Sequence, residues 1–511
     1  MTSSFSTNTV YTWGYYKELN PLYLNYVCAL NGHQPVLIED GFNYCELGCG
    51  YGVTTNGLAE LFPQGEFFGI DYNKDHIDAA TQMAEDIGLS NIRFQALDFN
   101  IIESAGLPQF DFIILHGVFS WVDPSTRESI VKFIATNLKE DGVVYLSYSA
   151  MPGWSAMASL RDIVLTHTAD MTTDDIVKAQ AGLDYLDFMA SNNAAFFRDN
   201  PPAKEFLTEI QSKHINYVAH ELLVDFSKPS YFHDVATEMN SVNLCFSGSA
   251  ILHLNFIDLA APPEFRNILE KVKTRDEFES RGDFIRNQRF RKDVFKKSQK
   301  TMSAEEQLQV LSHIVFDMTC TVDDFRTTVA FGDVELNYTG DIFSNLIQNL
   351  ADKPNSAANL ITMDEFRACP VELIVDALKF LSAGEQVIPL QARTEKQGEL
   401  DLEANRYTLT SNFNIQLLKR RLLKQDAIVL IAPKAGIGIE MSMADALFTL
   451  CLVEAKRDQV NDWVIQRLTE AKQEIAFSIG TEKNAVALAV QKFRKTRLPK
   501  FLELGILEPA N

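Results

Sequence analysis

The stretch ELGCGYG at residues 46–52 decides the fold. It follows the apolar run 43–47 and precedes a segment in which Leu58, Leu61 and Phe62 recur at helical spacing. Glycines at a strand-to-helix turn let the backbone fold tightly and approach a ligand closely. The stretch therefore predicts the first strand, loop and helix of an α/β sheet, with a ligand bound at the turn.

Four more apolar runs follow at the spacing of strand-helix-strand units. They occupy residues 67–70, 92–97, 112–115 and 142–148, and helical stripes of apolar residues separate them. Strands that alternate with helices predict a parallel sheet with helices on both faces. We therefore expect an α/β fold with a Rossmann-like, doubly wound sheet over residues 41–155.

Composition and charge narrow the class of protein. The chain has 511 residues, 46% hydrophobic and 22% charged, which is typical of a globular protein with several domains. Its formal net charge of -22 repels phosphate backbones and favours basic or neutral partners. We find neither a signal peptide nor an apolar run of the ~18 residues that a membrane span needs. These features predict a soluble cytoplasmic protein without a nucleic-acid or membrane partner.

The cysteines indicate no metal site. All seven are scattered, and although Cys45 and Cys49 lie close together, no second pair of Cys or His residues is near them. Buried or loop thiols in a reducing compartment are the expected state. We therefore expect no metal cofactor.

The glycine-rich turn fits two classes of ligand. A dinucleotide site has the pattern G-x-G-x-x-G, but its last glycine position is Val53 here. Glu46, two places before the first glycine, would weaken pyrophosphate binding, whereas it suits a ligand with an ammonium and a sulfonium group. The turn therefore indicates S-adenosylmethionine, and a nicotinamide-dependent dehydrogenase is the least favoured alternative.

Polar side chains at the ends of the next strands support the same ligand, because ligands of open α/β sheets bind at the carboxyl ends of the strands. Asp71 can bind both ribose hydroxyls, Asp98 can accept from the adenine amino group, and His116 follows the fourth strand, where the methyl group should lie. Asp71 and Asp98 also suit helix N-caps. The expected cofactor-binding residues are Glu46, Gly48, Cys49, Gly50, Gly52, Asp71, Tyr72, Leu97, Asp98, Phe99 and His116.

Several of these stretches resemble a known family. Residues 46–52 and 69–71 (GID) resemble the class I S-adenosylmethionine-dependent methyltransferases. Residues 116–122 (HGVFSWV) and 145–154 (YLSYSAMPGW) resemble its bacterial branch with a methyltransferase regulatory domain. That branch includes the rickettsial protein-lysine methyltransferases that act on outer-membrane proteins. The resemblance implies methyl transfer to lysine side chains of a protein substrate.

The resemblance to the regulatory domain is best at residues 217–221 (YVAHE) and 289–295 (RFRKDVF). Residues 371–380 are the expected third helix of a winged-helix-like middle domain, and they contain few Lys or Arg residues. This scarcity of positive charge favours contact with protein over contact with DNA. We expect an N-terminal helical segment 1–40, a class I methyltransferase domain 41–155, a helical insertion 156–215, a regulatory domain 216–297 as a candidate to complete the catalytic sheet, a winged-helix-like middle domain 305–395 and a C-terminal domain 396–511.

The resemblance also implies an acceptor site with apolar and aromatic walls, since a lysine amine must arrive neutral and a dry pocket disfavours its charge. We expect Trp121, Tyr148 and His116 to be catalytic. Further wall residues are Phe119 and Trp154, with Tyr11 and Tyr16 as lid residues. No general base is identified, and the proton can leave to solvent before transfer.

A basic cluster stands out in the acidic chain: Arg281, Arg286, Arg289, Arg291, Lys292, Lys296 and Lys297. Salt bridges to the acidic catalytic domain are favoured over a substrate-contact patch.

Two other functions stay open: a small-molecule methyltransferase of the same fold, and a cofactor-sensing scaffold whose C-terminal third binds partners. A wide cleft beside the cofactor favours a protein acceptor, whereas a narrow pocket favours a small molecule. We expect a protein partner, and a homodimer is left open.

Overall fold

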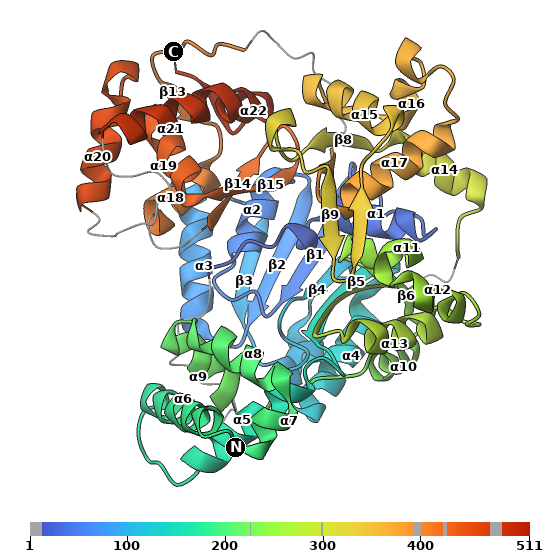
Figure 1. Ribbon diagram of the computed structural model, residues 1–511, viewed down its shortest axis with the longest axis vertical. Coiled ribbons are helices and arrows are strands. Elements are labelled where there is room, and N and C mark those ends of the chain that lie inside the picture. Colours follow the sequence, from blue (N-terminus) through green and yellow to red (C-terminus); the bar gives the residue numbers. More distant parts are fainter. Residues whose placement is uncertain are drawn as a thin grey trace.

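The structure is a computed structural model that describes residues 13–224, 226–297, 300–391, 400–422, 427–470 and 483–510. Its centre is a seven-stranded sheet with the order β3-β2-β1-β4-β5-β7-β6 (Figure 1). The strands are β1 (Phe42–Leu47), β2 (Gly65–Asp71), β3 (Ile92–Ala96), β4 (Phe110–Leu115), β5 (Leu138–Ser149), β6 (Cys245–Ser249) and β7 (Phe290–Lys296). Strands β1 to β5 are parallel, and β7 runs antiparallel between β5 and β6. The predicted doubly wound α/β sheet is confirmed.

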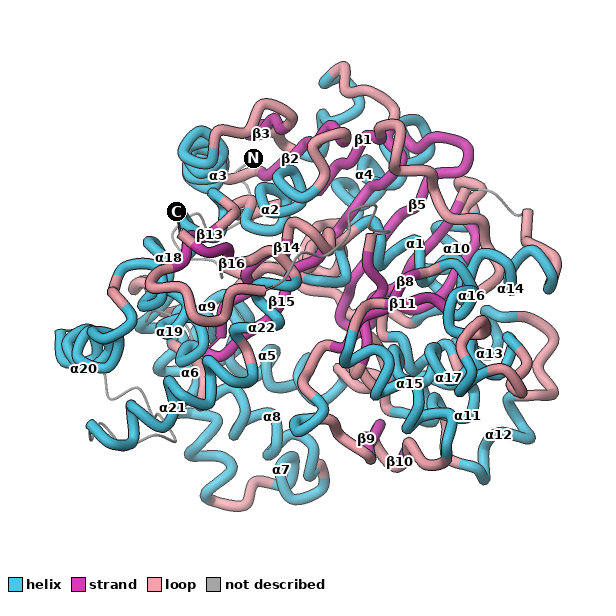
Figure 2. The backbone as a smooth tube through the Cα atoms, turned by 90° about the horizontal axis from the view of Figure 1, so that it is seen from above, coloured by secondary structure: helices cyan, strands magenta, loops and turns pink. Residues whose placement is uncertain are grey.

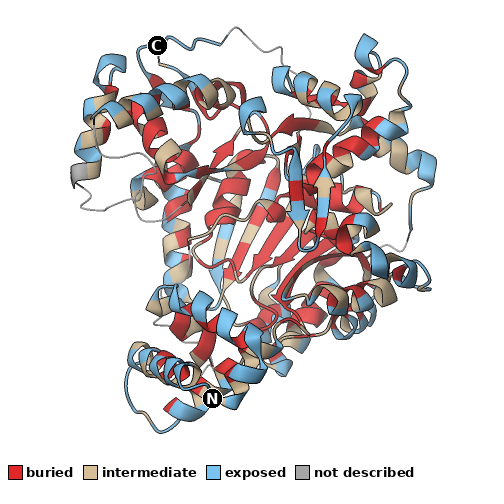
Figure 3. Ribbon diagram, viewed as in Figure 1, coloured by how far each residue is buried: buried red, intermediate tan, exposed pale blue. Residues whose placement is uncertain are grey.

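The two faces of the sheet bury alternate residues of each strand, as the twofold period of a strand requires. Tyr44 and Phe112 belong to the core on one face, and Cys45 and Ile113 belong to the core on the other. Figure 3 shows these strands as the most continuously buried part of the molecule. The first face is covered by α1 (Pro21–Leu30), α2 (Val53–Leu61) and α3 (Lys74–Ile87), and the second by α4 (Pro124–Asn137) and α10 (Phe232–Asn240).

Five helices between β5 and β6 form a unit with a hydrophobic core of its own. They lie at the opposite end of the molecule from the last helices of the chain (Figure 1), and helices surround the central strands when the chain is seen from above (Figure 2). They are α5 (Ser155–Thr168), α6 (Asp175–Ser191), α7 (Ala195–Asp199), α8 (Pro201–Gln211) and α9 (Ile215–Leu223). Helices α11 (Ile257–Ala260), α12 (Pro263–Leu269) and α13 (Arg275–Arg286) then lead into β7.

The described residues from Ala304 onward form two further units that share one continuous core with α1 and the first sheet face. The middle unit contains α14 (Ala304–His313), β8 (Val315–Met318), β9 (Thr328–Phe331), β10 (Val334–Asn337), α15 (Asp341–Asp352), β11 (Asn355–Ser356), α16 (Ala357–Leu360), α17 (Val371–Ala383) and β12 (Val387–Leu390). The C-terminal unit contains β13 (Tyr407–Leu409), α18 (Asn412–Arg421), β14 (Ala427–Ala432), β15 (Ile437–Ser442), α19 (Met443–Glu454), α20 (Val460–Glu470), α21 (Lys483–Thr496), α22 (Leu498–Glu503) and β16 (Leu507–Pro509).

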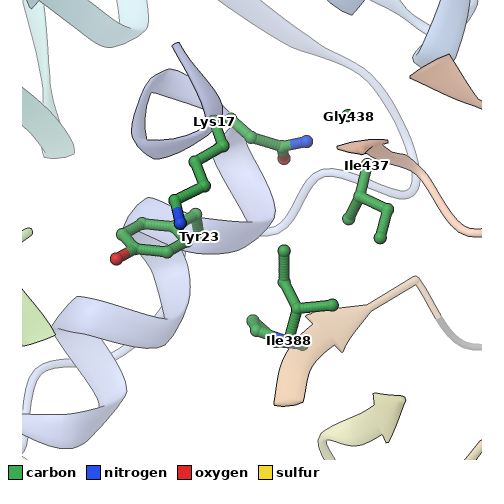
Figure 4. A pocket seen from close by; sticks show the side chains of 7 residues that line it. Lys17, Tyr23, Ile388, Ile437 and Gly438 are labelled. Atoms are coloured by element: carbon green, nitrogen blue, oxygen red, sulfur yellow. The ribbon is translucent and has the colours of Figure 1, made fainter. Parts of the chain in front are cut away.

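The segment before α1 joins these units. The Asn20 side chain donates a hydrogen bond of 2.7 Å to the Gly436 carbonyl, and Lys17 forms an ion pair of 2.8 Å with Glu385. Figure 4 shows the small cavity at this junction, with Lys17 and Tyr23 on one side and residues of β12 and β15 on the other. The N-terminal segment is therefore fixed by both C-terminal units.

The basic cluster forms ion pairs, but its partners differ from the predicted ones. Lys297 pairs with Glu140 of the catalytic domain, whereas Arg281, Arg286 and Arg291 pair with acids of α13 or β7. Arg291 of β7 is fully buried and contacts Glu279 at 2.9 Å, Asp283 at 2.6 Å and Asp293 at 2.8 Å. Glu279 and Asp283 lie on α13. A charge in the interior needs such partners. The network therefore fastens α13 to the sheet.

The described ranges contain neither a membrane-spanning helix nor a cluster of metal ligands. None of the helices there combines the length and the apolar character that crossing a bilayer requires. No group of three or more His, Cys, Asp or Glu side chains in the same ranges is arranged to hold a metal ion.

Candidate functional site

The loop between β1 and α2 is built for close backbone approach. The N–H groups of Gly48 and Cys49 both donate to the Ile70 carbonyl, at 2.7 and 3.1 Å. Gly48 has a φ of +77°, and a Cβ atom there would lie 2.3 Å from a methyl group of Val118. A side chain at this position would therefore both strain the backbone and clash. This is the glycine requirement that the sequence predicted.

Asp71, at the end of β2, holds the glycine loop in place. One carboxylate oxygen accepts from the Gly50 N–H at 2.9 Å, and the other accepts from the Asn73 N–H at 2.8 Å. The helix N-cap is Asn73, so Asp71 itself is not the cap. Because two carboxylate oxygens offer about four acceptor positions, Asp71 retains capacity for ligand hydroxyls beside the loop.

Glu46 lies beneath the same loop and is buried. It accepts a hydrogen bond from the Thr55 hydroxyl. Burial raises the pKa of Glu46 to about 7, with a smaller contribution from the charge of Asp71, while the Thr55 bond acts in the opposite direction. A cationic group of a ligand beside Glu46 would stabilise its charged form.

The predicted adenine-side residues lie at the end of β3, next to Asp71. The Leu97 N–H donates to the Asp71 carbonyl at 2.9 Å. Asp98 accepts from the Asn100 N–H at 2.9 Å and caps the short 3-10 helix Phe99–Ala105, which is the N-cap alternative left open by the sequence. Phe99 is buried and Tyr72 is exposed. None of Tyr72, Leu97, Asp98 and Phe99 lines the cavity beside the glycine loop.

A segment that precedes the first helix covers the glycine loop. We call residues 13–16 the N-terminal strap. Trp13 stacks on Tyr51 of the loop with ring centres 4.6 Å apart, and the Tyr16 N–H donates to Thr54 of α2 at 3.1 Å. Arg421 of α18 lies over the Trp13 ring, with its guanidinium carbon 5.2 Å from the ring centre. Tyr16 thus lies where a lid was expected, while Tyr11 is outside the described residues.

Beneath the strap is a cavity that adjoins the glycine loop. Its walls come from the strap, the loop, the start of α2 and the end of β4. They are Gly14, Tyr16, Glu46, Gly48, Cys49, Gly50, Tyr51, Val53, Thr54 and His116. The sequence-predicted residues Glu46, Gly48, Cys49, Gly50 and His116 therefore share one cavity.

His116 lies at the end of β4, on the border of two cavities. Its Nδ1 atom is 3.0 Å from the Tyr145 hydroxyl, and the Tyr16 ring packs on its ring at 3.9 Å between centres. Burial lowers the pKa of His116 to about 4. The imidazole is therefore neutral at pH 7 and puts no positive charge beside a cationic ligand.

The second cavity is much larger, with about 1370 Å³ of empty space when its open mouth is included. It lies between the ends of β4 and β5, the start of β7 and helices α5, α8 and α9. Its lining residues are Tyr16, His116, Gly117, Trp121, Ser149, Trp154, Met157, Glu209, Ile210, Lys213, Asn216, Tyr217, His220, Glu221, Arg289 and Phe290. Since Tyr16 and His116 line both cavities, they form the boundary between them.

Two of the three predicted catalytic residues, Trp121 and His116, line the large cavity. Tyr148 does not: it is buried on the opposite face of the sheet, and its hydroxyl donates to Asp293 at 2.7 Å. The reason is the alternation of strand side chains, which turns Ser149 to the cavity and Tyr148 away from it. Tyr148 is therefore part of the hydrogen-bond network around Arg291.

Helix α9 supplies wall residues that the sequence reading missed. Tyr217, His220 and Glu221 all line the large cavity. Glu221 is 7% exposed and stands beside Leu222 in an apolar helix. A carboxylate on the buried side of an amphipathic helix was the signal that could have identified it.

Comparison with known families places two parts of the chain. Residues 38–187 match the model of a methyltransferase domain, and residues 214–297 match that of a predicted methyltransferase regulatory domain. An uncharacterized protein of Synechocystis is 29% identical over 97% of both chains. An uncharacterized protein of Rickettsia prowazekii is 30% identical over 54% of this chain and 49% of its own.

Among solved structures, PKMT2 from Rickettsia typhi aligns with 98% of this chain and 100% of its own, with a TM-score of 0.74 and 17% identity. The same protein in complex with AdoHcy aligns over the same shares with a TM-score of 0.72. At this identity the likeness establishes the shared fold. The chain therefore carries a methyltransferase domain and a methyltransferase regulatory domain, and these matches together with the fold support S-adenosylmethionine as its cofactor.

Proposed function

We propose that the chain transfers methyl groups from S-adenosylmethionine to lysine side chains of a protein. The observation that carries this proposal is the large open cavity that meets the glycine-loop cavity at Tyr16 and His116. A space of about 1370 Å³ with an open mouth suits a side chain presented by a macromolecule. The fold likeness to PKMT2, the rickettsial lysine methyltransferase, supports the same substrate class.

We assign the cofactor to the glycine loop and its neighbours. When bound, S-adenosylmethionine supplies an activated methyl group on a sulfonium. The backbone of the loop fits close approach, because Gly48 has no room for a side chain. In this assignment Glu46 attracts the ammonium group, Asp71 accepts from the ribose hydroxyls and Asp98 from the adenine amino group.

The walls of the large cavity prepare the acceptor. Trp121, Trp154 and Phe290 bring aromatic surface to this cavity, and the Phe290 ring lies 6.5 Å from the His116 ring between centres. Such surroundings disfavour an ammonium and favour the neutral amine, which alone has a lone pair for attack. Holding that amine in line with the methyl group supplies much of the rate. Because His116 is neutral, it places no positive charge beside the sulfonium that would repel it.

The test is transfer of a radiolabelled methyl group from S-adenosylmethionine to poly-L-lysine, with poly-L-arginine and free lysine as the comparison acceptors. We expect incorporation into poly-L-lysine, with the label recovered as methyl-lysine after hydrolysis. Incorporation into free lysine alone would instead support a small-molecule acceptor. The absence of label in every lysine-bearing acceptor, from a chain that binds S-adenosylhomocysteine, would contradict the proposal.

We also propose the domain division derived from the sequence, with winged-helix-like units after residue 305. The order of α14, β8, α15, α17 and β12, and the pairing of β8 with β11 and β12, support that proposal for the middle unit. A location in the cytoplasm is proposed from the sequence alone.

A further inference from the structure

Helix α9 brings a buried carboxylate to the wall of the acceptor cavity. Glu221 is 7% exposed, yet it lines the cavity that meets the glycine-loop cavity at Tyr16 and His116. Tyr217, one helical turn earlier, lines the same cavity, and its hydroxyl is close enough to Glu221 to interact with the carboxylate. Tyr217 in turn lies near enough to Tyr16 to interact with it electrostatically. The acid is thus linked to the boundary between the two cavities.

The titratable and charged groups around Glu221 come from three helices. They are Tyr217 on its own helix, Glu209 on α8 and Arg161 on α5. Arg161 donates to the Val224 carbonyl, so part of its hydrogen-bonding capacity is directed to the backbone. Burial is the largest effect and raises the pKa of Glu221 to about 7, with Glu209 acting in the same direction and Arg161 against it. Near neutral pH the group can therefore both hold and release a proton.

The second acid in the cavity wall differs in its surroundings. The Glu209 side chain is 50% exposed and forms an ion pair of 2.9 Å with Arg289. Glu209 thus contacts both water and a guanidinium. Glu209 therefore suits attraction of basic segments to the mouth of the cavity, whereas Glu221 suits proton exchange inside it.

From this arrangement we infer that Glu221, oriented by Tyr217, is the acceptor-amine site: its carboxylate binds the ammonium of the incoming lysine and removes one proton. The inference rests on the proposed function, since it concerns the same acceptor. It also assigns a catalytic task to the regulatory domain, because α9 belongs to residues 214–297.

The proposed step balances. One N–H bond of the ammonium breaks, its proton moves to the Glu221 carboxylate, and its electron pair stays on nitrogen as a lone pair. That lone pair forms the new N–C bond while the C–S bond breaks, and the electrons of the broken bond remain on sulfur. The methylated amine then carries the positive charge. Glu221 returns its proton to solvent through the open mouth of the cavity.

The test compares Glu221→Gln with Glu205→Gln, which changes an exposed acid on α8 that lies outside the cavity wall. Methyl transfer to poly-L-lysine is measured from about pH 7 to about pH 10. We expect Glu221→Gln to lower kcat/KM about 100-fold at pH 7. The deficit should shrink below about tenfold at pH 10, where solvent deprotonates many of the amines. Glu205→Gln should follow the unmodified chain throughout.

A binding measurement adds a readout that does not depend on turnover. Calorimetry with S-adenosylhomocysteine present should show weaker binding of poly-L-lysine to Glu221→Gln, with unchanged binding of S-adenosylhomocysteine itself. Tyr217→Phe should show the same pH-dependent deficit in smaller measure, since it removes the hydroxyl that interacts with the carboxylate.

Two results would overturn the inference while leaving the lysine substrate intact: equal activity of Glu221→Gln and Glu205→Gln at pH 7, or a Glu221→Gln deficit that is the same at every pH. Failure of the unmodified chain to methylate poly-L-lysine would instead refute the proposed function.

Discussion

Acidification from about pH 8 to about pH 5 should weaken the binding of S-adenosylhomocysteine, because Glu46 then loses its charge. Burial raises the pKa of Glu46 to about 7 in the free protein. In our assignment the charged carboxylate attracts the ammonium group of the ligand. Bound ligand therefore lowers the pKa of Glu46, and binding is favoured where Glu46 is already ionised. Affinity should be full above pH 7 and decline as the pH falls below it.

The magnitude follows from the titration. Two units below its pKa, about 1% of Glu46 is ionised, so the affinity should fall up to about 100-fold, or about 2.7 kcal/mol. His116 adds nothing at this pH, because its pKa is lowered to about 4 and the imidazole is neutral. Binding near pH 6 should also release protons, so the measured enthalpy should depend on the ionisation enthalpy of the buffer.

Isothermal titration calorimetry of the unmodified chain and of Glu46→Gln tests this reasoning. Glutamine keeps the size of the side chain and an oxygen for the Thr55 hydroxyl, while it removes the charge. At pH 8 the variant should bind S-adenosylhomocysteine more weakly than the unmodified chain does. Its affinity should not change with pH. Glu66→Gln, at an exposed position of β2, serves as the control. The reasoning is refuted by an unmodified chain with pH-independent affinity, or by a variant that keeps the same slope.

Three further predictions concern the loop and the core. Asp71→Ala should weaken S-adenosylhomocysteine binding at least tenfold in the same calorimetry, since hydrogen bonds to a charged group contribute about 1.5–3 kcal/mol. Unchanged affinity would show that Asp71 does not bind the ribose. Gly48→Ala should abolish measurable binding because its Cβ would lie 2.3 Å from Val118, and normal affinity would disprove the close-approach argument. Arg291→Leu should destabilise the fold by about 3–5 kcal/mol in urea unfolding, since it leaves three buried carboxylates without their shared cation. Arg281→Leu, which removes an exposed pair, should cost less than about 1 kcal/mol, and equal losses would contradict a special role for Arg291.

The sequence was informative where the signal is local. Buried parallel strands appear as short apolar runs, and each of the first five ends in a glycine or polar residue that marks the ligand edge of the sheet. The predicted strand at residues 112–115 is part of β4, and the strand at 92–97 is β3 with one residue fewer. The glycine requirement at Gly48 was also readable, because it follows from the turn itself.

Strand β7 could not be recognised in this way. Its sequence, FRKDVFK, has four charged residues among seven, which is typical of a solvated segment. Arg291 and Asp293 are nevertheless buried, because they neutralise each other and the acids of α13. Glu221 was missed for a related reason. Its position in the cavity wall depends on packing between helices that are distant from the glycine loop in sequence.

Strand β7 also limits how the gene can be divided. It pairs with β5 along seven residues of each strand and carries β6 on its other side, so residues beyond 240 complete a sheet that begins at residue 42. A truncated chain that stops at residue 187, where the first matched domain ends, would leave β5 with an unpaired edge. Open edges of this kind recruit other chains and aggregate. The two matched segments thus contribute strands to one sheet, and we expect that they must be expressed together to fold.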